Sequence, residues 1–332
     1  MEEASGIPGF YGAFLHGSLL GQAADTLLPE TSDVDVMLVT AGSPPQVRLG
    51  KFIYRGVLLE ASHLASERLQ SPEQVLTDYH LAGSFRAPDI IADPTGHLTR
   101  LGAAVSRDFA RREWVRRRCE DAHNKAARDL RSVHSDRPHP DQVLAWLFGA
   151  GKAAHILLVA GLMNPTVRRR YAAVRELLCD YGHLPFYERL LEMNGCARIS
   201  RAQAERHLAV LADVFDATSP LIRSLFPFAS DLSAAARPIA IDGSRDLIEA
   251  GDHREAMFWI AVTYSRCMVV LHHDAPTQTR DRFAAAYQHL LDDLGVLSPD
   301  ALQARVSVAA ALLPQVWDVA EAVLTANPAV EA

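Results

Sequence analysis

The spacing of apolar residues changes at about residue 98. Before that point, apolar residues form short runs bounded by Gly, Ser, Thr or Pro, as buried β-strands do. Beyond it, the segments are long, and their apolar residues recur three and four positions apart, which is typical of amphipathic helices. The sequence therefore predicts an α+β protein, in which a small mixed-sheet domain, residues 1–97, is followed by an all-helical bundle domain, residues 98–332.

Individual elements follow from the same patterns. Strands are expected at residues 10–16, 34–39, 46–54, 57–64 and 89–92. The first domain should also hold a helix at 72–81, because Pro72 suits the first helical position and Ser71 can cap it. Long helices are expected at 98–133, 140–161, 166–181, 200–216, 252–273, 278–294 and 299–325, with a break in the 235–243 stretch.

The composition narrows the class of protein. Apolar residues make up 49% of the 332 residues and charged residues 22%, the profile of a folded soluble chain. No uninterrupted apolar run reaches the roughly 18 residues of a membrane-spanning helix, and the acidic N-terminus lacks a secretory signal pattern. The expected location is therefore cytoplasmic, with no membrane partner. The net charge of -7 argues against a general nucleic-acid binder, and the four scattered cysteines favour reduced thiols over disulfides or a zinc site.

Two aspartates stand at the start of the expected strand 34–39. Residues two apart on a strand project from the same face, so Asp33 and Asp35 point together while Val34 and Val36 point toward the core. Two carboxylates held side by side repel each other strongly unless a cation lies between them. Oxygen ligands on a rigid element suit Mg²⁺. The pair is interpreted as a metal site, and the alternative is a pair of loop-edge carboxylates with a turn-capping role.

Three further residues extend this interpretation. Glu60 lies in an apolar run, where an ionisable group is costly, and it can ligate a metal ion or accept the proton of an attacking hydroxyl. Its alternative is a salt bridge at a strand edge. Gly17 allows the backbone to approach a phosphate closely, and the hydroxyl of Ser18 can bind phosphate oxygens. His16, beside them, is interpreted as a packed or hydrogen-bonded strand residue rather than a catalyst.

The Gly-Ser pair at 17–18, the Asp-Val-Asp run at 33–35 and the later Glu60 together resemble the DNA polymerase β-like nucleotidyltransferase superfamily. The layout, a small catalytic domain before a helical one, looks most like that of the antibiotic (aminoglycoside-type) nucleotidyltransferases. The motif match covers roughly residues 10–65. The resemblance implies two Mg²⁺ ions held by the three carboxylates, a nucleoside triphosphate as co-substrate, and transfer of a nucleoside monophosphate to a hydroxyl.

The helical region offers one candidate phosphate ligand. In the resembling family the helical domain often sends a lysine to the triphosphate, and Lys152 lies on an otherwise apolar helix. The alternative is a surface lysine whose stem covers apolar neighbours. The basic segments 111–118 and 168–170 are interpreted as solvated helix surface, with Trp114 either in the core or stacked on a base. The histidines at 272–273 point about 100° apart on a helix, which favours a helix C-terminus over a metal site.

The expected reaction is magnesium-dependent transfer of a nucleotidyl group from a nucleoside triphosphate, with ATP as the expected donor. The expected acceptor is a hydroxyl of a small molecule such as an aminoglycoside-like antibiotic. Two alternatives stay open: nucleotidylation of a macromolecule, either a protein or a tRNA, and a catalytically silent nucleotide-binding protein. A tRNA substrate requires a broad basic face, which only 111–118 suggests. Retention of three mutually repelling carboxylates argues against lost activity.

Overall fold

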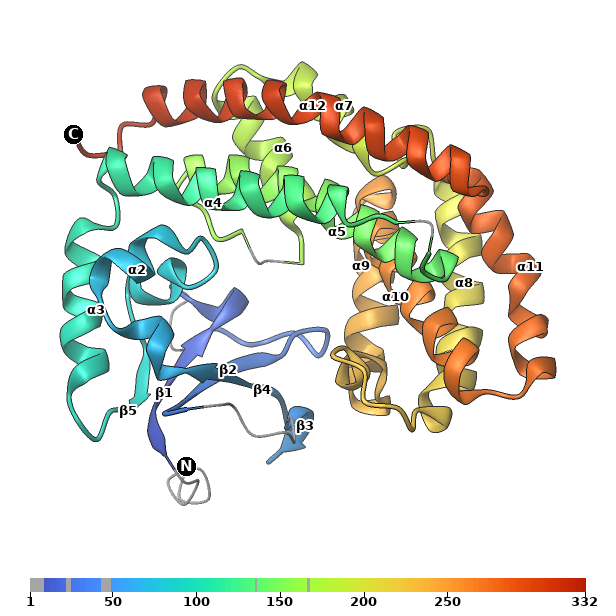
Figure 1. Ribbon diagram of the computed structural model, residues 1–332, viewed down its shortest axis with the longest axis horizontal. Coiled ribbons are helices and arrows are strands. Elements are labelled where there is room, and N and C mark those ends of the chain that lie inside the picture. The colour runs from blue at the N-terminus through green and yellow to red at the C-terminus, as the bar shows by residue number, and fades with distance from the viewer. Residues whose placement is uncertain (1–8, 22–24, 43–48, 135, 166–167) are drawn as a thin grey trace. The chain divides into compact units, whose positions relative to one another are not determined.

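The computed structural model describes residues 9–21, 25–42, 49–134, 136–165 and 168–332. Its sheet has five strands in the order β3-β4-β2-β1-β5 (Figure 1). The strands are β1 (Phe10–His16), β2 (Val34–Thr40), β3 (Gly50–Tyr54), β4 (Val57–Ala65) and β5 (Ile90–Ala92). β2 and β4 pair in parallel and the other neighbouring strands are antiparallel, so the sheet is mixed, as predicted.

One face of the sheet is covered by helices. Phe14, Val39 and Leu64 are buried there against apolar side chains of α2 (Pro72–Thr77) and α3 (His97–Asp108). Both helices lie beside the sheet in Figure 1. The residues that form the smaller buried cluster of the sheet are Ala13, Leu38 and Ala61. Alternation along the strands therefore separates two layers, as period-2 patterning requires.

The helix α2 begins as the sequence predicts. Pro72 occupies its first turn, and the side chain of Ser71 accepts a hydrogen bond from a backbone N–H of that turn. The helix ends at Thr77, earlier than the predicted residue 81. The chain turns there because the carboxylate of Asp78 accepts hydrogen bonds from the N–H groups of the two residues at 80 and 81.

Eleven α-helices lie within the described residues. Besides α2 and α3 they are α4 (Arg112–Arg131), α5 (His139–Ala160), α6 (Arg170–Asp180), α7 (Tyr187–Met193), α8 (Arg201–Thr218), α9 (Gly243–Glu249), α10 (His253–Asp274), α11 (Thr277–Asp293) and α12 (Pro299–Ala326). Together with the mixed sheet they confirm the α+β class.

Some sequence expectations need correction. The predicted helix 98–133 is two helices, α3 and α4, because the chain turns after Asp108 and the N–H of Arg112 bonds to the carbonyl of Glu331. The expected break at 235–243 contains a π-helix, Pro238–Asp242, that leads into α9. Neither α7 nor α9 was predicted. The parts of the predicted elements that fall on 43–48 and 166–167 lie outside the described residues.

The chain divides into two compact units. The first, here called the sheet unit, comprises Met1–Ala122, His155–Arg170 and Ala320–Ala332. The second, the helical unit, comprises His123–Ala154 and Tyr171–Val319. These units do not follow the predicted domains 1–97 and 98–332, because α3 and parts of α4, α5 and α12 belong to the sheet unit. The two predicted domains stay a prediction.

Among the described residues, two helices, α5 and α12, are long and apolar enough to cross a membrane by length and composition alone. In α5, 83% of the most apolar window is buried inside the protein, and in α12 the share is 39%. A buried core helix of a soluble protein passes the same test, so these helices are weak evidence for a membrane location. Polar residues such as Lys152 interrupt α5, which is why no uninterrupted apolar run stands out in the sequence.

Candidate metal centre

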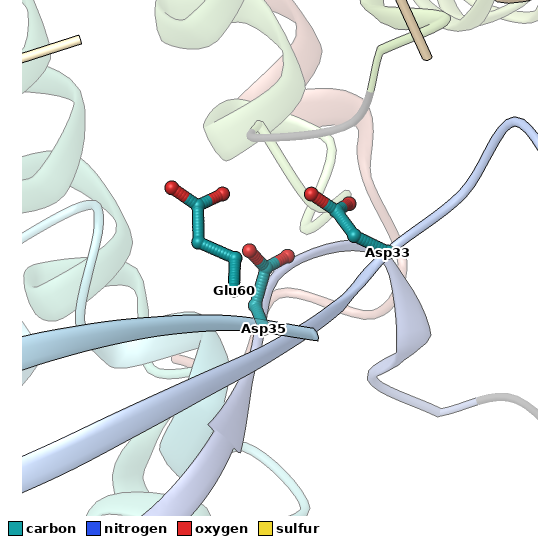
Figure 2. A group of neighbouring side chains, drawn as sticks. All are labelled: Asp33, Asp35 and Glu60. Carbon is teal, nitrogen blue, oxygen red and sulfur yellow. The ribbon is translucent and has the colours of Figure 1, made fainter. Parts of the chain in front are cut away.

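Three carboxylates meet on the sheet. Asp33 directly precedes β2, Asp35 lies within β2, and Glu60 lies in β4. One carboxylate oxygen of each lies within 4.8 Å of those of the other two. Figure 2 shows the three side chains rising from the same side of the strands. Together with Lys51, described below, these residues are called the acidic site.

The strand register explains this convergence. The parallel pairing of β2 with β4 places Asp35 directly opposite Glu60, and directly paired residues share a face. Asp33 precedes Asp35 by two positions and points the same way, as the alternation predicts. Val36, on the opposite face, packs against the cluster of Ala13, Leu38 and Ala61, which confirms its expected orientation toward a core.

A lysine from β3 completes the acidic site. Lys51 pairs with Glu60 across the antiparallel β3–β4 hairpin. Its ammonium forms ion pairs with the carboxylates of both Asp33 and Glu60. The Lys51 side chain is 7% exposed, against 17% for Asp33 and 26% for Glu60. Sequence reasoning missed this lysine, although the two-residue turn Arg55-Gly56 was a signal for the register that brings it to Glu60.

The carboxyl of Asp35, in the middle of the acidic site, is a much weaker acid than an ordinary aspartate. The pKa of Asp35 is raised to about 8, first by burial and then by the neighbouring charges of Asp33 and Glu60. The ammonium of Lys51 acts in the opposite direction, and a hydrogen bond shared with Glu60 raises the pKa further. At neutral pH the Asp35 carboxyl is therefore protonated in the protein without bound metal.

The donor set of the acidic site fits a magnesium ion. Carboxylate oxygens are the hard ligands that Mg²⁺ prefers, and those of Asp33, Asp35 and Glu60 are close enough to share one ion. Three carboxylates outnumber the single ammonium of Lys51, and the raised pKa of Asp35 shows that the site favours additional positive charge. Within the part of the chain that the structure describes, these three residues form the group that could hold a divalent cation.

Gly17 is required by the position of Asp35. Its φ is +79°, and a Cβ atom there would lie 1.8 Å from Oδ2 of Asp35. A side chain at this position would therefore displace the carboxylate. Ser18 follows in a short 3₁₀ helix, Gly17–Leu19, and is partly buried. The structure brings Gly17 and Ser18 to the acidic site, and their contact with a phosphate stays a prediction.

Asn164 holds the same turn from a distant part of the chain. Its side-chain amide donates a hydrogen bond of 2.7 Å to the carbonyl of Gly17, across 147 positions in the sequence. Nearby, the guanidinium of Arg86 donates to the carbonyl of Leu162 at 2.7 Å, which anchors the segment that carries Asn164. Sequence reasoning did not single out Asn164, because its partner lies 147 positions away.

His16 is a hydrogen-bonded strand residue, as interpreted from the sequence. Its Nδ1 lies 2.5 Å from the hydroxyl oxygen of Ser84. Burial lowers the pKa of His16, and the negative charge of Asp78 opposes that effect. The imidazole therefore favours its neutral form. His16 pairs with Asp35 across β1 and β2, which places it on the same face of the sheet.

Lys152 belongs to the helical unit. Its ammonium lies 2.6 Å from a carboxylate oxygen of Asp129 and 3.3 Å from the carbonyl of Phe148. Its side chain is 15% exposed, so it is more buried than a solvated surface lysine. A role for Lys152 at the triphosphate stays a prediction. The histidines at 272–273 do lie in the last turn of α10, as interpreted.

The basic segment 111–118 is largely engaged within the protein. Arg116 pairs with Glu321 at 2.7 Å and Arg117 with Glu113 at 2.7 Å. Arg118 is 2% exposed and donates to two backbone carbonyls, those of residues 76 and 109. Arg118 is therefore a buried structural residue, whereas the other arginines of the segment are exposed and form ion pairs or hydrogen bonds at the surface.

Comparison with known proteins adds no family to these observations. Models of known protein families give no match to the chain, and a search of curated proteins gives no significant match. Its functional class is therefore inferred from the acidic site and from the residues that hold it.

Proposed function

We propose that the chain is a magnesium-dependent nucleotidyltransferase that moves a nucleoside monophosphate from a nucleoside triphosphate to a hydroxyl group. The observation that carries this proposal is the parallel register of β2 and β4. It sets Asp35 opposite Glu60 and beside Asp33, with one oxygen of each within 4.8 Å of the others. Sets of two or three carboxylates of this kind hold the metal ions of phosphoryl-transfer sites.

The reaction exchanges one phosphorus–oxygen bond for another. The acceptor oxygen bonds to the α-phosphorus, the bond from that phosphorus to the oxygen bridging to the β-phosphate breaks, and pyrophosphate leaves with the electron pair. Asp33 and Asp35 would hold Mg²⁺, which when bound orients phosphate oxygens and stabilises the departing charge. The hydroxyl proton passes to a carboxylate, for which Glu60 is the candidate because it is more exposed than Asp33. Glu60 would alternatively ligate a second ion.

A small polyhydroxylated acceptor, such as an aminoglycoside-like antibiotic, is the acceptor class we favour. It rests on the resemblance to antibiotic nucleotidyltransferases, and fold alone does not fix a substrate. A tRNA acceptor is less well supported, because the one basic segment that suggested it is engaged in internal ion pairs and hydrogen bonds. Proteins remain within the proposal as a second class of acceptor, one that offers side-chain hydroxyl groups.

One observation favours a second function, a catalytically silent nucleotide-binding protein. Lys51 pairs with Asp33 and Glu60 and so relieves the repulsion among the carboxylates. The retention of all three carboxylates therefore argues less strongly for activity than the sequence suggested. Such a protein would bind a magnesium–nucleotide complex and transfer nothing.

The test supplies each α-labelled nucleoside triphosphate with Mg²⁺ and a panel of hydroxylated antibiotics, proteins and tRNA. The wild type is compared with Asp35→Asn, and Asp213→Asn, an exposed aspartate of α8, serves as the matched control. We expect label transfer that falls by about a hundredfold or more in Asp35→Asn, since even outer-shell changes at metal sites cost about 10- to 100-fold. The control should retain full transfer.

The same experiment separates the alternatives. Magnesium-dependent nucleotide binding without transfer to any acceptor would identify the silent nucleotide-binding protein. Absence of both transfer and magnesium-dependent nucleotide binding in the wild type would exclude the proposed function.

A further inference from the structure

The position of Lys51 has a consequence for how the acidic site takes up a metal ion. Its side chain is only 7% exposed, and its ammonium forms ion pairs with the carboxylates of Asp33 and Glu60. It therefore lies among oxygens that a divalent cation would need as ligands. A bound divalent cation would compete with the lysine ammonium for the lone pairs of these oxygens and would repel its positive charge.

Electrostatics gives the lysine a defined role in the protein without metal. Like charges held close together in a partly buried site destabilise the fold unless a cation offsets them. The strand register fixes the backbone of Asp35 opposite that of Glu60, so the two carboxylates can move apart only by side-chain rotation. The ammonium of Lys51 is the cation that the chain itself supplies.

The chemistry of lysine suits a temporary role. Its ammonium is a point charge at the end of a flexible four-carbon stem, and it makes no planar, two-pronged contact of the kind that fixes an arginine. Lys51 is rooted on β3, and its partners lie beside β2 and on β4. Rotation of the stem alone can withdraw the ammonium while the sheet stays intact.

On the basis of the proposed function, we propose that Lys51 is the resident cation of the acidic site and that a binding divalent metal ion displaces its ammonium from Asp33 and Glu60. The lysine then acts as a positioning residue. It keeps the carboxylates together before metal binds, and it sets the metal affinity by competing for their oxygens.

The first experiment measures competition directly. Mn²⁺ is titrated into metal-free wild type, Lys51→Met and Arg55→Met at 0.15 M salt, and free Mn²⁺ is followed by its EPR signal. Arg55 is an exposed residue of the same hairpin, so its substitution removes the same charge from a position where salt screens it. We expect Lys51→Met to bind Mn²⁺ at least about tenfold more tightly than the wild type, and Arg55→Met to match the wild type.

The second experiment uses only wild-type protein, so it does not depend on a variant that folds. The chain has three lysines, Lys51, Lys125 and Lys152, and their acetylation by acetic anhydride can be resolved by peptide mass spectrometry. Lys51 should react slowly without metal and severalfold faster in saturating Mg²⁺. Lys152, which pairs with Asp129 in the helical unit, is the internal reference and should not change.

The outcomes separate this inference from the proposed function. If Mn²⁺ binds wild type and Lys51→Met equally well, or if bound Mg²⁺ leaves the reactivity of Lys51 unchanged, the exchange is overturned and the metal site stands. If neither protein binds Mn²⁺, the exchange and the proposed nucleotidyl transfer are overturned together.

Discussion

Two regions of the molecule gather carboxylates around one basic side chain, and they balance charge differently. In the helical unit, Arg175 donates to Asp252 at 2.8 Å and to Glu255 at 3.0 Å, and the hydroxyl of Tyr187 also donates to Glu255. We call these four residues the Arg175 network. There, two carboxylates face one guanidinium. In the acidic site, three carboxylates face one ammonium.

The geometry of the two regions also differs. Asp252 and Glu255 are only 5% and 4% exposed, and the planar guanidinium fork serves both. Asp33 and Glu60 are 17% and 26% exposed, and both form ion pairs with the ammonium of Lys51, which acts as a point charge. Burial and the charge of Glu255 raise the pKa of Tyr187, so its hydroxyl remains a hydrogen-bond donor.

The difference separates a charge cluster that is satisfied within the protein from one that could take up a cation. The Arg175 network satisfies its acceptors within the protein and leaves no reason for an external ligand. In the acidic site, full ionisation of all three carboxyls is costly, so the third one, Asp35, holds a proton at neutral pH, and a bound cation could take the place of that proton. Three of the four predictions below compare a change at or near the acidic site with a matched change in the helical unit, and the one on pH compares Asp35→Asn with the wild type.

The largest effect on stability is expected from the same substitution made in both regions. Glu255→Gln removes a buried charge that faces Arg175, and breaking a buried ion pair costs about 3–5 kcal/mol. We expect its free energy of unfolding to fall by about 3 kcal/mol. Glu60→Gln should change it by less than about 1 kcal/mol, because lost attraction to Lys51 is offset by reduced repulsion from Asp33. Urea unfolding in EDTA measures both, and similar losses would contradict the comparison.

The second prediction compares two glycines with the same backbone conformation. Gly17 and Gly182 have φ of +79° and +75°, but only at Gly17 would a Cβ atom meet the Asp35 carboxylate, at 1.8 Å, whereas around Gly182 nothing lies within 4 Å. Gly182→Ala should cost about 1 kcal/mol through backbone strain alone. Gly17→Ala should cost about 2–3 kcal/mol and also weaken Mn²⁺ binding by about tenfold or more. Equal Mn²⁺ affinity in the two variants would argue against contact between Gly17 and Asp35.

Only part of this contrast could be predicted from the sequence. The short apolar runs identified the strands, and two aspartates two positions apart on a strand must share a face. Glu60 was a candidate because an ionisable group interrupted an apolar run. Its contact with Asp35 depended on a parallel register that no local pattern specifies. Lys51 became visible only once the turn had fixed the β3–β4 pairing.

The remaining features depend on contacts between residues that are far apart in the sequence, and local patterns do not predict such contacts. Asn164 donates a hydrogen bond to Gly17 across 147 positions, and the sequence around either residue does not indicate this contact. The break after α3 has no Gly or Pro, and its cause is a bond from Arg112 to the carbonyl of Glu331 near the C-terminus. Helix periodicity was a sound guide to the long helices, because burying an apolar stripe requires it.

The third prediction concerns pH. An aspartate in an unfolded chain ionises near pH 4, whereas folded Asp35 has a pKa of about 8. Between these values folding takes up a proton, so the stability of the metal-free wild type falls as pH rises from about 4 to about 8. Asp35→Asn does not titrate. Its free energy of unfolding should therefore exceed that of the wild type by a margin that grows by up to about 1.4 kcal/mol per pH unit through this window and then levels off.

The measurement is urea unfolding of both proteins in EDTA at intervals from pH 5 to pH 9. Burial also lowers the pKa of His207 in the helical unit, and its hydrogen bond and charge interaction with Asp293 oppose that effect. Its contribution is common to both proteins and cancels in the difference. A margin that stays constant with pH would show that Asp35 ionises normally.

The smallest effect is expected at Asn164, where stability and metal affinity should be linked. Asn164→Ala removes one hydrogen bond to Gly17 and should cost about 1 kcal/mol. The turn at Gly17 also confines Asp35, so Mn²⁺ affinity should fall by up to about tenfold. Asn194 is the matched control in the helical unit, where its amide donates to the hydroxyl of Tyr171 and to a backbone carbonyl. Asn194→Ala should cost at least as much stability and leave Mn²⁺ affinity unchanged. If both variants lose Mn²⁺ affinity in proportion to their loss of stability, the acidic site responds to a general loosening of the fold. If only Asn164→Ala loses Mn²⁺ affinity, the hydrogen bond to Gly17 is part of what holds the carboxylates in place.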